Sequence, residues 1–106
     1  MTPSLYIANF FAGAFLCNCV PHLVAGLQGA AFPTPFATPR GVGESSALVN
    51  FLWGLLNLVA GLFLLWLHPL ALNPGPSALL FLLGALLLGC YLAIHFGKVR
   101  AERPTR

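Results

Sequence analysis

The chain has 106 residues, of which 58% are hydrophobic and 7% are charged, and it carries a formal net charge of +3. A soluble domain has charges on roughly a quarter of its residues, so a water-facing globular surface is excluded. The apolar residues form long blocks and the mean hydropathy is +0.87, so lipid is the main solvent and residues 1–106 form a single domain with no separate soluble module.

Three apolar blocks are long enough to cross a membrane: residues about 5–27, 47–67 and 78–97. Each has about 20 residues, which at 1.5 Å per residue spans a hydrocarbon core of about 30 Å. None contains an Asp, Glu, Lys or Arg. We predict helices because a segment in lipid must satisfy its own backbone groups, and because the blocks lack the alternation of barrel strands. The expected fold is an all-α integral membrane bundle of three transmembrane helices.

The first predicted helix, residues about 5–27, contains the stretch CNCVPH, in which an amide, two thiols, a proline and an imidazole lie inside an oily segment. Pro21 has no N–H, so it leaves the carbonyl of Cys17 without its helical partner and bends the helix there. The amide of Asn57, in the second predicted helix, lies at about the right depth to donate to that carbonyl. We therefore expect the bend to be satisfied by a neighbouring helix.

The inner loop, residues 28–46, contains three prolines, which forbid a regular helix. Phe32 and Phe36 are unusual in a solvated loop, and we interpret the segment as a connector on the membrane surface. The alternative is a segment that folds back over the inner mouth of the bundle, as a lid or a docking site. Ser45 and Ser46 are expected to cap the second helix.

The basic residues are concentrated in the tail, residues 98–106, which holds four Lys or Arg and one Glu. The N-terminal end has no charged side chain, and the outer turn, residues 68–77, has none apart from one histidine. The positive-inside rule therefore places the C-terminus in the cytoplasm and, with three spans, the N-terminus outside a multi-pass protein of the cell membrane. Four charges on a short tail are a poor footprint for nucleic acid, so the lipid bilayer is the expected contact and no nucleic acid is.

Each predicted helix carries its small and polar residues on one side, because they recur at spacings of three or four. We expect the three sides to face one another, since small residues let helices approach and amides hydrogen-bond between them. The polar residues fall at matching depths, which predicts a common interior near the cytoplasmic side. The candidate functional residues are Asn18, His22, Asn50, Asn57, Tyr91 and His95. The residues expected to pack the helices together are Gly54, Gly61, Gly84, Ala85, Gly89 and Ala93.

The third predicted helix has a second face of small residues, formed by Ala85, Gly89, Ala93 and Gly97. A bundle of three helices has little use for both faces of its last helix. We therefore assign the second face to a homo-oligomer contact or to a larger membrane partner. Close packing against the first helix of the same chain is the alternative.

The residue types argue against catalysis and against a resident cofactor. No carboxylate lies within a predicted span, and thiols in apolar surroundings are poor nucleophiles, so we expect no enzyme activity and no catalytic residues. Three cysteines without a C-x-x-C pair most often act as inert, small hydrophobic side chains. We therefore predict no cofactor and no metal site. Haem or metal ligation through His22 and His95 is an alternative.

The preferred function is that of a protomer of an oligomeric channel or transporter, whose Asn/His/Tyr interior lines the path of a small neutral solute or of protons. One chain of three helices is too thin to enclose a pore, so transport requires an oligomer. The alternatives are an accessory or assembly subunit of a larger membrane complex, and a haem- or metal-binding membrane redox protein. An interpretation in which the polar cluster only holds the helices together is equally open.

Overall fold

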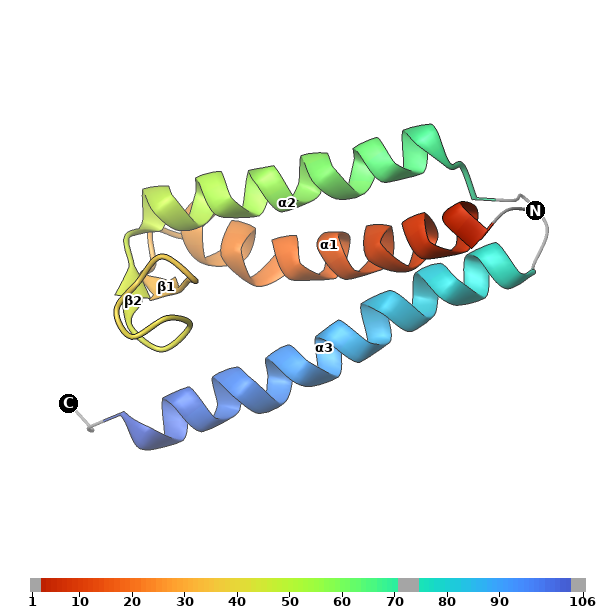
Figure 1. The fold of residues 1–106 in the computed structure, drawn as a ribbon. Coiled ribbons are helices and arrows are strands. Elements are labelled where there is room, and N and C mark those ends of the chain that lie inside the picture. Colours follow the sequence, from red (N-terminus) through yellow and green to blue (C-terminus); the bar gives the residue numbers. More distant parts are fainter. Residues whose placement is uncertain (1–2, 71–74, 104–106) are drawn as a thin grey trace.

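The computed structural model describes residues 3–70 and 75–103. Within them the chain forms three α-helices, α1 (Pro3–Leu27), α2 (Ala47–Leu67) and α3 (Pro76–Glu102) (Figure 1). Each is long and apolar enough to cross a membrane, which confirms the predicted all-helical fold with three candidate spans. α3 runs beyond the predicted end at residue 97, because the start of the basic tail contains good helix formers.

α1 is the central helix of the bundle. α2 and α3 both pack along it and make almost no contact with each other. Figure 1 shows this order, with the inner loop and the C-terminal end of α3 at one end of the molecule and the N-terminus at the other. It also shows α3 diverging from α1 toward the C-terminus. α2 and α3 therefore flank α1 without closing a three-helix ring, and the space between α1 and α3 widens toward the C-terminal end of α3.

The α1–α3 crossing is a contact between backbones. A Cβ added at Gly13 would overlap the carbonyl oxygen of Phe81, and a Cβ added at Gly84 would overlap the carbonyl oxygen of Phe10. Only glycine leaves room for two helices to approach in this way. The crossing fixes α3 to α1 in the half of the bundle that lies away from the inner loop.

Glycines also bring α2 against α1. A Cβ at Gly54 would lie 2.8 Å from the backbone nitrogen of Leu23, and a Cβ at Gly61 would lie 2.7 Å from the side chain of Leu16. Both glycines are therefore on the side of α2 that faces α1. The two contacts lie two turns apart along α2 and hold the two antiparallel helices close together over this part of their length.

The second small-residue face of α3 begins against α1. A Cβ at Gly13 would lie 3.1 Å from the backbone nitrogen of Ala85, and a Cβ at Gly89 would lie 3.5 Å from the sulfur of Cys17. Further along, a Cβ at Gly97 would have no neighbour within 4 Å. The first half of this face therefore packs against α1 of the same chain, as the alternative prediction had it. The second half is an open surface.

The inner loop folds back on the bundle. Two short antiparallel strands, β1 (Phe32–Pro33) and β2 (Glu44–Ser45), close it, with Phe32 opposite Ser45 and Pro33 opposite Glu44. The Phe32 ring lies 4.7 Å from that of Phe96 on α3, and the Phe36 ring lies 5.0 Å from that of Trp53 on α2 (centroid distances). The loop therefore lies between α2 and the diverging end of α3. This agrees with the alternative interpretation, in which the segment folds back over the inner mouth of the bundle.

Polar contacts fix both ends of the loop. The hydroxyl oxygen of Ser46 accepts from the backbone N–H of Val49 at 3.2 Å, which is the predicted N-cap of α2. Ser45 bonds instead to the hydroxyl of Thr34. On the α3 side, Arg103 Nη1 lies 2.9 Å from Glu44 Oε2.

We predict that Gly84→Ala destabilises the protein and that Gly97→Ala does not. The methyl group at residue 84 meets a backbone carbonyl that cannot rotate away, so the free energy of unfolding should fall by about 1–3 kcal/mol. At residue 97 it meets nothing within 4 Å. Thermal unfolding in the same detergent, followed by size-exclusion chromatography, measures both variants. Equal melting temperatures would contradict the backbone crossing.

Candidate functional site

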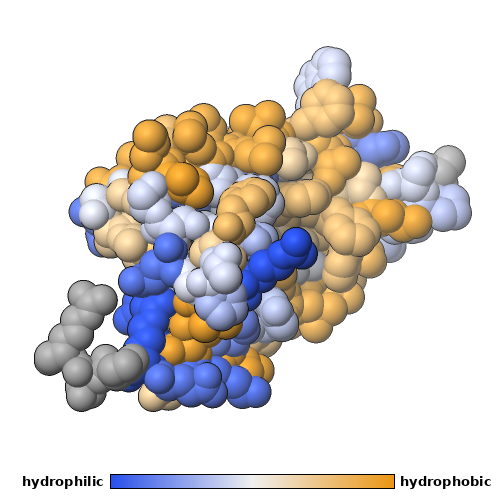
Figure 2. All heavy atoms as spheres, turned by 60° about the vertical axis from the view of Figure 1, so that its left-hand side comes forward, coloured by the Kyte–Doolittle hydropathy of each residue, from blue (hydrophilic) through white to orange (hydrophobic). Residues whose placement is uncertain are grey.

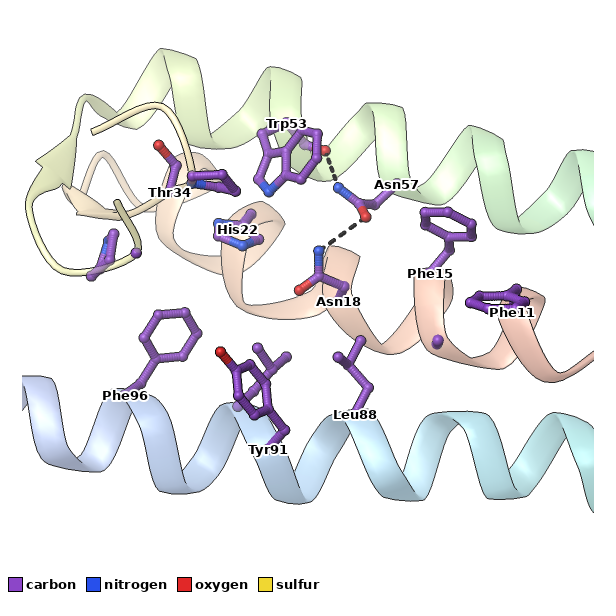
Figure 3. A pocket seen from close by; sticks show the side chains of 15 residues that line it. Phe11, Phe15, Asn18, His22, Thr34, Trp53, Asn57, Leu88, Tyr91 and Phe96 are labelled. Atoms are coloured by element: carbon purple, nitrogen blue, oxygen red, sulfur yellow. Dashed lines mark hydrogen bonds between the residues drawn. The ribbon is translucent and has the colours of Figure 1, made fainter. Parts of the chain in front are cut away.

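Two polar pairs join α1 to α2. Asn18 Nδ2 donates to Asn57 Oδ1 at 3.0 Å, near the middle of both helices (Figure 3). Closer to the inner loop, His22 Nδ1 lies 2.8 Å from Asn50 Oδ1. At most 2% of the surface of His22, Asn50 or Asn57 is exposed. The polar residues of α1 and α2 therefore meet inside the protein and away from lipid.

Asn50 lies at the junction of α1, α2 and the inner loop. Its Nδ2 is within 3.2 Å of the carbonyl oxygens of Phe32, Ser45 and Ser46. These oxygens only accept hydrogen bonds, so the amide nitrogen must face them and the amide oxygen must face His22. His22 Nδ1 is therefore the donor of its pair.

α3 contributes a separate pair of rings. Tyr91 and His95 stack with their centroids 5.7 Å apart, and His95 Nε2 donates to the carbonyl oxygen of Gly41 at 2.6 Å. The ring of Phe96 lies against both imidazoles, with centroids 6.5 Å from His22 and 5.1 Å from His95. The six predicted residues thus form two groups. Four join α1 to α2, and two lie on α3, where one of them holds the loop.

A groove with a volume of about 380 Å³ separates the two groups (Figure 3). α1 forms its floor, α2 and α3 form its walls, and the inner loop closes one end. Tyr91 and Leu88 reach into it from α3 toward Asn18 (Figure 3). It is lined by Phe11, Ala14, Phe15, Asn18, His22, Pro33, Thr34, Pro35, Gly41, Trp53, Asn57, Leu88, Tyr91, Leu92 and Phe96.

The groove has a polar end and an apolar end. Phe11, Phe15 and Leu88 line the part away from the loop. Toward the loop, the hydroxyl of Tyr91 and the Oδ1 of Asn18 form no hydrogen bond with any described residue. The indole nitrogen of Trp53, also in the lining, is buried and has no acceptor within the described part of the chain. The lining includes no Asp, Glu, Lys or Arg.

The predicted role of Asn57 at the proline of α1 is wrong. α1 continues through Pro21 to Leu27, and Asn57 Nδ2 donates to the carbonyl of Trp53 in its own helix at 2.8 Å, not to the carbonyl of Cys17. The oxygen of Asn57 is already engaged by Asn18, which turns the nitrogen back toward the preceding turn of α2.

Asn9 and Thr34 are among the buried polar residues that sequence reasoning missed. Asn9 is completely buried, and its Nδ2 donates to the carbonyl oxygen of His68 at the end of α2 with a distance of 2.8 Å. Thr34 is 1% exposed, and its carbonyl accepts from the backbone N–H groups of Ala37 and Gly41. The burial of Asn9 could have been predicted, because an amide within a membrane span usually faces the protein interior. The sequence around Thr34, a threonine between two prolines, does not indicate burial.

The thiols and imidazoles do not gather. Within the described residues, no three or more His, Cys, Asp and Glu side chains are grouped closely enough to hold a metal ion. The three cysteines are unpaired, and Cys19 donates to the carbonyl of Leu16 at 2.9 Å. His22 and His95 each use a ring nitrogen in a hydrogen bond to a different partner. The two imidazoles are therefore held by different elements, His22 by α2 and His95 by the inner loop.

We predict that Asn50→Leu releases the inner loop. The substitution leaves His22 and three carbonyl groups without their shared partner, which should cost about 1–3 kcal/mol in the free energy of unfolding. Trypsin should then cleave after the exposed Arg40 faster than in the unmodified protein. Leu56→Ala, at a lipid-facing position that is 58% exposed, is the matched control. Similar cleavage rates in both variants would count against the junction.

No protein-family model, curated protein or solved structure matches this chain. The three apolar helices are those of a small multi-pass membrane protein. Its function must therefore be inferred from the groove and from the side chains around it.

Proposed function

We propose that the chain is a non-enzymatic protomer of an oligomeric carrier in the cell membrane, and that its groove binds a small uncharged amphiphilic solute. The carrying observation is the groove itself, about 380 Å³ in volume, with apolar walls and unused hydrogen-bonding groups at its inner end. The orientation that we propose has the N-terminus outside. It places the loop and the basic end of α3 in the cytoplasm, in agreement with the positive-inside rule.

The chemistry of the lining supports an uncharged ligand. No Asp, Glu, Lys or Arg lines the groove, so nothing there would offset the desolvation of an ion. The Oδ1 of Asn18 can accept a hydrogen bond, and the hydroxyl of Tyr91 can donate or accept one. A ligand with a hydroxyl or carbonyl group at one end and an apolar body would satisfy these groups and fill the phenylalanine-lined end.

The open side of the groove supports an oligomer. α2 and α3 make almost no contact with each other, so the groove is open between them, and Tyr91 in its wall is 60% exposed. A single chain therefore encloses no path across the membrane, whereas a second copy against this side would enclose one. We accordingly propose that copies meet along α2 and α3, and not at the part of the small-residue face that contacts α1.

The proposal predicts that water reaches the groove and does not reach the outer surface of α2. In a protein whose cysteines are replaced by serine, Ala14→Cys would place a thiol in the groove, and Leu56→Cys would place one in lipid. A charged methanethiosulfonate reagent should label the first thiol at least about tenfold faster, because only a hydrated thiol ionises. The measurement is the labelling rate in proteoliposomes, with the molar mass in detergent measured by light scattering.

Two outcomes would overturn this proposal. Equally slow labelling of both thiols would mean that the polar residues only hold the helices together. A monomeric mass in detergent and in lipid nanodiscs would remove the oligomer, and an accessory subunit of a larger complex would then fit better.

A further inference from the structure

A second groove, with a volume of about 420 Å³, lies between α1 and α3 on the other side of their interface. It exists because α3 diverges from α1 beyond the Gly13–Gly84 crossing, while small residues on α3 leave the space unfilled. Leu92 and Phe96 line both grooves and form the wall between them. The lining consists of Cys17, Val20, Pro21, Phe32, Gly89, Leu92, Ala93, Phe96, Gly97 and Arg100.

One cationic side chain stands at the end of this otherwise apolar groove. Arg100 follows Ala93 by seven residues, so it continues the same face of α3 one turn beyond Gly97. It is exposed and forms no ion pair with any residue that the structure describes, whereas Arg103 is engaged by Glu44. Figure 2 shows the hydrophilic side chains gathered at this end of the molecule, beside hydrophobic ones.

We propose that this second groove binds one acyl chain of an anionic phospholipid, whose phosphate pairs with Arg100. The groove runs along α3 from Gly89 to Arg100, roughly 16 Å at the rise of an α-helix, and ends in a positive charge at the level of the lipid headgroups. A phospholipid matches this order, since it joins an apolar chain to a negative headgroup. The proposal does not depend on the function proposed for the first groove.

The floor of the groove is suited to a flexible chain. The nearest atom to a Cβ at Gly89 is the sulfur of Cys17 at 3.5 Å, and a Cβ at Gly97 has no neighbour within 4 Å. The groove thus widens toward its charged end. A lipid chain there would contact the flat surface of small residues and the rings of Phe32 and Phe96, which are themselves packed together with centroids 4.7 Å apart.

The test is lipid retention by the purified full-length chain, measured by native mass spectrometry. The protein is incubated in detergent with equal amounts of phosphatidylglycerol and phosphatidylcholine and then released from the micelle. We expect one phosphatidylglycerol to be retained with a preference of about fivefold, the effect of one arginine at a membrane surface.

Three variants separate the headgroup from the groove. Arg100→Gln should abolish the preference, while Lys98→Gln, also exposed but outside the lining, should keep it. Gly97→Leu adds a side chain to the groove at a position where a Cβ has no neighbour within 4 Å, so it should reduce the retention of both lipids although all charges remain.

Three results would overturn the proposal. Equal losses in the Arg100 and Lys98 variants would mean that any positive charge attracts the lipid. Undiminished retention in Gly97→Leu would mean that the headgroup binds without the groove. A protein dimer that Gly97→Leu dissociates, without bound lipid in the unmodified protein, would assign the groove to a second copy.

Discussion

In lipid the hydrophobic effect does not drive one helix against another, so hydrogen bonds between segments must hold them together. The amide of Asn50 makes the central set of these bonds. It accepts from His22 on α1 and donates toward three carbonyls, one in β1, one in β2 and one at the N-cap of α2. A single side chain thereby joins two helices and both ends of a proline-containing loop. The position of the loop, and with it the closed end of the first groove, depends on this junction.

α1 is attached to its two neighbours by different kinds of contact, and the difference explains the shape of the molecule. Amides, an imidazole and two glycines hold α2 along the length of α1. α3 is held closely at the Gly13–Gly84 crossing and, at its other end, through the loop, by the bonds of His95 and Arg103. Because one neighbour is held throughout and the other mainly at its ends, both grooves lie alongside α3.

The three helices and the polar side of each could be predicted, because lipid requires long apolar segments and a helix repeats every three to four residues. Periodicity gives the direction in which a side chain points, but not the distance to the next helix. It therefore indicated that Asn18 and Asn57 face one another, yet it did not reveal that the divergence of α3 separates His95 from His22. The bond from His95 to Gly41 and the strands at Phe32 and Glu44 depend on how the loop folds, and proline-rich segments carry no periodic signal for that.

The wall of Leu92 and Phe96 has a mechanical consequence, since it belongs to both grooves at once. The tightest contact of α3 is at a pair of glycines far from its basic end, so this contact would be the pivot of any movement of that end. If that end swings toward α2, the space on one side of the wall shrinks while the space on the other side grows. A molecule that displaced this wall to widen one groove would therefore narrow the other.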